Sequence, residues 1–203
     1  MQITVNKRTG EKTFRLYDED IRPVLFDAYE ETNEKLRIFE EFVIGKSRAD
    51  ALMVTETELI GFEIKSDMDS LERLEKQIKN YNRFCDKNYL VVGNKYALKA
   101  EEHIPDFWGL CYVFADEEGG LHMEVLREAV QNPRIRLKTQ MKFLWRSELI
   151  SIMKEFKLGG VSKRNKKEMV ERILECLEKE EVKTLLCDRL LERDYTIYEE
   201  EDR

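Results

Sequence analysis

The apolar residues in the first half of the chain follow the short period that is typical of β-strands. Three segments, at residues 36–44, 49–55 and 58–65, are rich in β-branched and aromatic residues and are separated by short polar turns. Because these turns are short, neighbouring segments are expected to pair as an antiparallel meander. A helix is predicted ahead of them, from Asp18 to about Thr32, since acidic residues and a proline suit a helix start.

After residue 65 the apolar spacing becomes helical. A helix is predicted from residue 69 to about 84, because apolar side chains recur there at intervals of three and four: Leu71, Leu74, Ile78 and Tyr81. The run at 89–92 is typical of a buried strand, and a strand after a helix indicates a parallel crossover. The remaining predicted elements are a helix at 95–102, strands at 108–114 and 121–126, and helices at 142–156, 165–177 and 181–193.

These elements divide the chain into an α/β domain at residues 1–135 and a small, all-helical, basic module at 136–203. Hydrophobic residues make up 42% of the 203 residues and charged residues 38%, a composition typical of soluble globular proteins. No apolar run reaches the roughly 18 residues that cross a bilayer, so no membrane partner is expected. The first residues do not resemble a signal peptide, and the four cysteines form no C-x-x-C pair. A cytoplasmic protein with reduced cysteines is predicted.

The charge is distributed unevenly along the chain. The net charge is −7, yet residues 134–172 contain twelve Lys and Arg against four Glu, a local balance of +8 that leaves −15 for the rest. One basic module in an acidic protein favours binding of a polyanion such as DNA. The alternative is a solvated helical surface, which charged runs usually form.

Two carboxylates and one lysine are predicted to meet at the ends of adjacent strands. Glu63 and Lys65 lie on the same face of their strand because side chains alternate with period two. Asp50, on the preceding strand, is expected to reach the same place across a hairpin. Asp50, Glu63 and the backbone carbonyl of Ile64 would then hold Mg²⁺ or Mn²⁺, with Lys65 beside an attacking water and a phosphate. Surface carboxylates in ordinary ion pairs are the alternative.

Three further residues are candidates for the same site. Gln77 and Tyr81 are one helical turn apart and share a face, where an amide and a phenol can contact a phosphate or orient Lys65. Core packing explains Tyr81 equally well, because it also belongs to the apolar stripe. Arg48 is a candidate for a phosphate contact, and a plain surface arginine is the alternative.

Several strings around these residues resemble the PD-(D/E)XK nuclease superfamily, in particular its MmcB-like and RecB-like branches and a group of uncharacterised bacterial and phage proteins. The resemblance covers about residues 25–195. Its strings are Arg48–Asp50, Gly61–Asp67, Leu71–Leu74, Gln77–Tyr81, Ile104–Gly109 and Leu144–Arg146.

The resemblance implies a restriction-endonuclease-like fold, a mixed central sheet flanked by helices, and a magnesium-dependent deoxyribonuclease. By position, Asp50 and Glu63 are then metal ligands, Lys65 is the catalytic lysine, and Gln77 and Tyr81 match a Q-x-x-x-Y element. Such an enzyme would hydrolyse phosphodiester bonds in DNA.

The sequence departs from the superfamily pattern at two points. Ala49 stands where the superfamily's name has proline. Many members also use a glutamate on the first core helix as a further metal ligand. Glu41 is the best candidate here although it falls in a predicted strand, and Glu30 and Glu31 are the alternatives.

The basic module has a helix–loop–helix pattern from Trp145 to Leu177 that resembles the SAP motif, a small DNA-binding hairpin, although Lys157 replaces its usual glycine. Four side chains near the second helix are expected to neutralise phosphates without reading sequence: Lys163, Arg164, Lys166 and Lys167. The alternative is a helical cap on the α/β domain with a solvated basic loop.

A metal-dependent DNA nuclease is therefore the leading hypothesis from the sequence. The alternatives are a non-catalytic nucleic-acid-binding protein with a nuclease-like fold, and a phage-type protein-interaction factor. The form of the nucleic acid, the sequence preference and the oligomeric state are left open.

Overall fold

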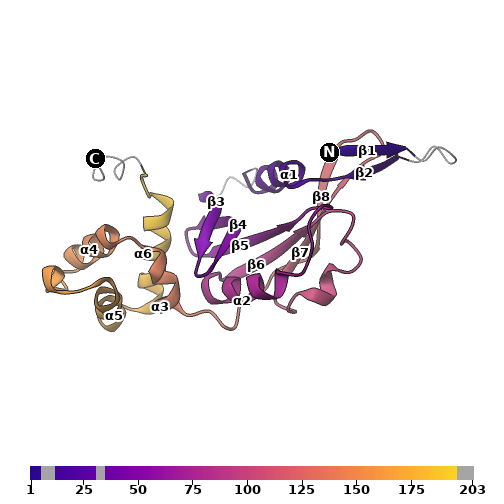
Figure 1. Ribbon diagram of the computed structural model, residues 1–203. Coiled ribbons are helices and arrows are strands. Elements are labelled where there is room, and N and C mark those ends of the chain that lie inside the picture. The colour runs from indigo at the N-terminus through magenta and orange to yellow at the C-terminus, as the bar shows by residue number, and fades with distance from the viewer. Residues whose placement is uncertain (6–11, 31–34, 196–203) are drawn as a thin grey trace.

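A six-stranded mixed sheet forms the centre of the molecule in the computed structural model, which describes residues 1–5, 12–30 and 35–195 (Figure 1). The strands lie in chain order: β3 (Leu36–Ile44), β4 (Ser47–Thr55), β5 (Leu59–Lys65), β6 (Lys87–Val92), β7 (Gly109–Ala115) and β8 (Leu121–Arg127). The first three strands pair antiparallel, β5–β6–β7 pair parallel, and β8 returns antiparallel. The predicted α/β class, the meander and the parallel crossover are confirmed.

The sheet is covered by one long helix on each face (Figure 1). Helix α1 (Asp18–Glu30) packs with Ile21 and Leu25 against the face that carries Ala51, Met53 and other apolar side chains. Helix α2 (Leu74–Phe84) packs against the opposite face. Because both faces of the sheet are covered, nearly every residue of β5 and β6 is buried, including the charged residues Glu63 and Lys65 of β5.

Two helix predictions need correction. Helix α2 begins at Leu74 rather than at residue 69, because the Asp69 carboxylate accepts hydrogen bonds from the backbone N and Oγ of Ser66 and closes a turn there. The helix predicted at 95–102 is a turn followed by the short 3₁₀ helix η1 (Ala100–His103). The Tyr96 hydroxyl donates to the Asp69 carbonyl at 2.6 Å and ties this segment to the turn. The predicted end of the first helix, residues 31 and 32, lies outside the described residues.

A separate two-stranded hairpin precedes α1. It consists of β1 (Gln2–Val5) and β2 (Lys12–Arg15). These strands were not predicted, because segments this short carry too little alternation.

The chain ends in a helical module that completes the core on the α2 side of the sheet. Its elements are α3 (Leu137–Gln140), η2 (Met141–Phe143), α4 (Arg146–Glu155), η3 (Val161–Lys163), α5 (Lys166–Cys176) and α6 (Lys179–Leu191). The helix predicted from 142 begins at Arg146, because Glu148 accepts a hydrogen bond from the Trp145 backbone N and caps the helix there. Buried side chains of α4–α6 belong to the same hydrophobic cluster as those of α2 and the sheet.

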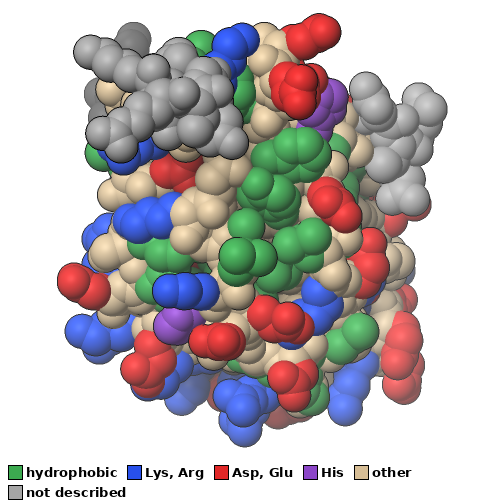
Figure 2. All heavy atoms as spheres, turned by 90° about the vertical axis from the view of Figure 1, so that its right-hand side faces the viewer, with side chains coloured by type: hydrophobic (Ala, Val, Ile, Leu, Met, Phe, Trp, Pro, Cys, Tyr) green, Lys and Arg blue, Asp and Glu red, His purple; other side chains and the backbone are tan. Residues whose placement is uncertain are grey.

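The opposite end of the molecule carries a patch of apolar side chains on its surface (Figure 2). Figure 2 shows hydrophobic side chains gathered on the face that looks away from the helical module. On β8, at the edge of the sheet, Val125 and Leu126 are exposed. Among the described helices, none has the length and apolar character that a bilayer crossing requires.

A buried carboxylate–lysine cluster beside a basic hollow

Strand register brings Asp50, Glu63 and Lys65 to one place on the α2 face of the sheet. Ala51 pairs with Phe62 across β4 and β5, so Asp50 lies opposite Glu63 one residue further along. Phe62 and Ile64 pack on the α1 side. Because side chains alternate along a strand, Glu63 and Lys65 point to the other side.

The Tyr81 hydroxyl separates the two strands at this point. It donates a hydrogen bond to the Phe62 carbonyl at 2.7 Å and accepts one from the Asp50 backbone N at 3.2 Å. The Asp50 Oδ2 accepts from the Ile64 backbone N at 2.7 Å. The β4–β5 ladder therefore ends at Ala51 and Phe62, and side chains replace its next backbone hydrogen bonds.

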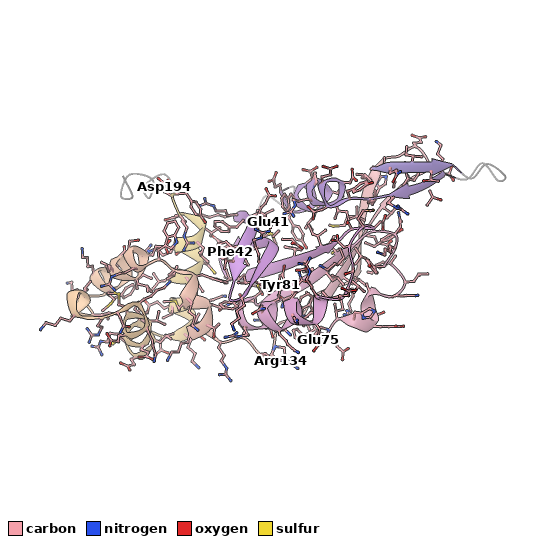
Figure 3. All side chains as sticks on the ribbon, in the orientation of Figure 1. Glu41, Phe42, Glu75, Tyr81, Arg134 and Asp194 are labelled. Carbon is pink, nitrogen blue, oxygen red and sulfur yellow. The ribbon has the colours of Figure 1, made fainter. Side chains whose placement is uncertain are left out.

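Gly61 leaves room for the Tyr81 ring to lie directly against β5. A Cβ atom placed on Gly61 would lie 2.6 Å from the Tyr81 ring, a separation that real Cβ contacts do not show. Tyr81 is fully buried on α2 (Figure 3), and burial raises the pKa of its hydroxyl well above the usual value. The phenol is therefore neutral and serves as a hydrogen-bonding bridge inside the protein.

Lys65 and Glu63 form an ion pair inside the core. The Lys65 Nζ lies 2.6 Å from the Glu63 Oε1, and the two residues are 4% and 0% exposed. The second carboxylate oxygen, Glu63 Oε2, is buried and has no hydrogen-bond partner among the described residues. Burial raises the pKa of Glu63, although Lys65 acts in the opposite direction.

The pKa of the Asp50 carboxyl is raised far above its ordinary value. Burial first, and then the neighbouring charge of Glu63, raise the pKa of Asp50 from 3.8 to about 7, while the Ile64 N–H and Lys65 lower it. Near neutral pH the Asp50 carboxyl is therefore partly protonated.

Asp50 should make folding stability fall with rising pH. The folded carboxyl binds a proton between about pH 4 and pH 7 that the unfolded chain has released, so its contribution is lost across that interval and stays lost above it. In Asp50→Asn this decline should be absent. Urea unfolding of both proteins from pH 4 to pH 8 measures it. Asp27→Asn, which changes an exposed carboxyl of α1, is the control. Parallel profiles for Asp50→Asn and the unmutated protein would contradict the assignment.

A hollow of about 620 Å³ opens beside Asp50. Gln77 lines it, and the Gln77 Oε1 is buried without a hydrogen-bond partner among the described residues. Cations dominate the rest of its lining: Lys46, Arg48, Arg73, Lys76 and Lys79. Asp50 and Glu41 are the carboxylates that line this hollow. It is consequently a mainly electropositive surface that includes the partly buried carboxylate of Asp50 and the exposed carboxylate of Glu41.

Glu41 lies at the rim of this hollow, at the position of β3 where pairing with β4 is interrupted opposite Asp50. Its carboxylate forms ion pairs with Arg48 Nε at 2.6 Å and with Arg22 at 3.1 Å. The alternative Glu30 ends α1 more than two helical turns beyond Arg22. Glu31 lies outside the described residues.

Arg22 is a site residue that the sequence did not single out. Its NH1 donates to the Asp50 carbonyl at 2.7 Å, and its guanidinium also pairs with Asp18 and Glu41. Its position in the first turns of α1 gave no signal, because this contact joins residues that are far apart in the chain.

The donor atoms fit a hard cation in part. Glu63 Oε2 and Gln77 Oε1 are buried oxygens without partners, and Asp50 adds a carboxylate with a raised pKa. Oxygen donors of this kind suit Mg²⁺, which keeps several waters and needs few protein ligands. The described residues contain no group of three or more acidic, histidine or cysteine side chains that could hold a metal ion.

The basic residues of the helical module form a second location, away from the Asp50 cluster. Lys166 Nζ donates to the Lys142 carbonyl at 2.8 Å, and Arg164 NH1 donates to the Gly159 carbonyl at 2.9 Å. Lys163 and Lys167 are exposed. A hollow of about 350 Å³ on this surface is lined by Lys138, Lys142, Lys166, Lys167 and Val170.

Fold and site together define a mixed α/β protein with a buried carboxylate–lysine pair, a basic hollow lined by the neighbouring Asp50, and a helical module that completes the core. The chain belongs to the bacteriophage P4 protein cII family, whose model matches residues 17–200. It is also similar to protein cII of Enterobacteria phage P4, with 26% identity over 120 residues. That match covers 59% of this chain and 45% of the phage P4 protein, so the chain spans less than half of that relative. No solved structure matches the chain.

The family membership corrects the sequence interpretation. The assignment to the PD-(D/E)XK superfamily is wrong. The metal-dependent deoxyribonuclease activity that was inferred from it is wrong as well. The structure supplies a physical reason for the false signal. The Glu-x-Lys pair forms an internal ion pair and the tyrosine of the Q-x-x-x-Y string bridges two strands, so both strings have structural uses.

Proposed function

We propose that this protein is a non-catalytic, phage-type factor that acts by binding nucleic acid. The observation that carries the proposal is the cationic lining of the hollow beside Asp50, where five Lys and Arg side chains surround a concave surface. Phosphate groups are the ligands that such a surface attracts, and these contacts carry most of the affinity for nucleic acid.

The helical module contributes the second part of the proposed interface. Lys163, Arg164, Lys166 and Lys167 lie near the start of α5, where backbone N–H groups also favour anions. Arg48 joins them from the rim of the first hollow. The proposal includes a restriction-endonuclease-like arrangement of the sheet, for which the mixed strand order is the supporting observation.

The proposal also assigns Mg²⁺ a binding role at Asp50, Glu63 and Gln77, with Glu41 and the Ile64 carbonyl as further candidate ligands. The supporting observation is the pair of buried oxygens that lack partners. A bound divalent cation would supply positive charge next to two carboxylates and attract a phosphate oxygen. Lys65 and Tyr81 would keep the carboxylates in place through the contacts described above.

DNA binding without cleavage is the expected result. Fluorescence anisotropy with labelled single-stranded and duplex DNA should show affinity that falls steeply with salt, with a slope of about 0.9 per phosphate contact for duplex. Lys163→Ala/Lys167→Ala should reduce that slope by about 1.8. Lys99→Ala/Arg15→Ala removes the same charge from exposed positions elsewhere and should leave the slope nearly unchanged.

The non-catalytic part of the proposal needs its own measurement. DNA incubated with the protein in Mg²⁺ or Mn²⁺ should keep its length on a gel, and Asp50→Asn should bind DNA as the unmutated protein does when EDTA is present. Cleavage that disappears in Lys65→Ala would refute the proposal. Absence of any salt-dependent DNA binding would leave a protein-interaction factor as the function.

A further inference from the structure

A further basic hollow lies between α2 and the segment that leads into the helical module. It has a volume of about 330 Å³ and is lined by Lys79, Asn82, Arg83, Arg134, Arg136 and Thr139. Four of these six side chains are cationic, and no described carboxylate lines the hollow. None of these four cations was named as a candidate site residue from the sequence, although Arg134 and Arg136 belong to the basic segment at 134–172.

The walls of this hollow are fixed by buried hydrogen bonds. Asn132 is 1% exposed, and its Nδ2 donates to the carbonyls of Asn82 at 3.0 Å and Cys85 at 2.8 Å, at the end of α2. Its Oδ1 accepts from the Arg134 backbone N at 2.9 Å. One buried amide therefore joins the end of α2 to the segment that carries Arg134, which Figure 3 shows beneath α2.

A second buried amide holds the other side of the hollow. Gln140 is 2% exposed, and its Nε2 donates to the Phe84 carbonyl at 3.2 Å and to Asp86 Oδ2 at 3.0 Å. Gln140 ends α3, the turn that carries Thr139. The backbone around Arg134 and Arg136 is thus held before any ligand arrives, which reduces the entropy lost on binding.

Two of the four cations in this hollow have no partner within the described part of the protein. Among the described residues, neither the Arg134 nor the Arg136 guanidinium forms a hydrogen bond or an ion pair with a protein group. The Arg83 guanidinium lies 5.8 Å from the centre of the Phe84 ring, and Lys79 pairs with the exposed Glu75. Like charges gathered on a rigid concave surface repel one another, and an anion with several acceptor oxygens removes that cost.

We infer that this hollow binds a backbone phosphate of the same nucleic acid that occupies the hollow beside Asp50. Lys79 lines both hollows, so the two basic surfaces are continuous along α2. The inference rests on the proposed function and extends it. The bound nucleic-acid strand would run along α2, from the hollow beside Asp50 to the hollow that contains Arg134 and Arg136. Sequence selectivity is not expected from this contact, because arginine–phosphate contacts position the backbone without reading bases.

The salt dependence of DNA binding by Arg134→Ala/Arg136→Ala tests this inference. Both side chains are exposed and unpaired, so the full-length variant should fold normally, which circular dichroism checks. The slope of log affinity against log salt should fall by about 1.8 for duplex DNA. Arg134→Lys/Arg136→Lys should recover most of the slope because the charge is kept. The Lys99→Ala/Arg15→Ala variant is the control for total charge.

Each outcome separates the two proposals. If the unmutated protein binds DNA and the alanine variant keeps the full slope, the junction hollow makes no phosphate contact and this inference is wrong, while the proposed function stands. If the unmutated protein does not bind DNA, the proposed function fails. Calorimetry with inorganic pyrophosphate then decides the site alone: binding that is lost in Arg134→Ala/Arg136→Ala supports a phosphate site, and no binding overturns it.

Discussion

Replacement of Lys65 by methionine is expected to lower the free energy of unfolding by about 3–5 kcal/mol, the cost typical of leaving one partner of a buried ion pair alone. Lys65 Nζ is the hydrogen-bond donor to Glu63 Oε1 at 2.6 Å, and Glu63 is fully buried. Because Glu63 Oε2 already lacks a partner, the variant leaves the whole carboxylate without a described hydrogen bond. Urea unfolding at pH 8, where the unpaired carboxylate is costly, measures the change.

A double-mutant cycle makes this result specific to the pair. Removing both charges in Lys65→Met/Glu63→Leu should recover part of the loss, since apolar side chains can replace a buried ion pair at little cost. Lys79→Met breaks an exposed pair with Glu75 and should cost at most about 1 kcal/mol. A Lys65→Met variant as stable as Lys79→Met would show that the buried pair contributes little.

Replacement of Asp86 by alanine is expected to cost about 3 kcal/mol or more, because one buried carboxylate oxygen serves three partners. Asp86 Oδ2 accepts from the Leu59 backbone N at 2.7 Å and from Gln140 Nε2 at 3.0 Å. It also pairs with Lys183 on α6. The variant removes an acceptor from β5, α3 and α6 together.

Because Asp86 contacts both the sheet and the helical module, this variant tests whether the two parts unfold together. Asp86→Ala should lower the midpoint of chemical unfolding while fluorescence and circular dichroism still report one transition. Glu171→Ala, which removes an exposed pair with Lys138, is the control and should change stability by less than about 1 kcal/mol. Two separate transitions in Asp86→Ala, or a loss no larger than in Glu171→Ala, would contradict a joint role for this carboxylate.

Apolar periodicity was sufficient to predict most of the fold. Strand alternation located β3, β4 and β5, and the change of period after Lys65 located α2 and the crossover to β6. The failures have local physical causes. The side-chain hydrogen bonds of Asp69 delay α2 by several residues, and the Tyr96 contact to the same turn leaves only a 3₁₀ helix where α-helix was predicted.

The sequence was sufficient to predict which residues of the site lie close together, but not what they do. Period-two alternation predicts that Glu63 and Lys65 share a face and that Asp50 lies nearby, and the structure brings these three residues together. Their chemistry was not accessible, because it depends on long-range contacts. The tyrosine bridge spans 31 residues to Asp50, and Arg22 reaches Asp50 across 28 residues. Short motifs therefore predicted proximity correctly and an enzymatic activity wrongly.

The single hydrophobic cluster that joins the sheet to α4, α5 and α6 constrains how this protein can change by recombination. A recombination point near residue 135 would separate the sheet from the helical module and expose the apolar surfaces that they bury against each other. Each fragment would then be prone to aggregation. Exchange between related genes should consequently be tolerated only when both segments are inherited together, or when the new helical segment carries a complementary apolar face.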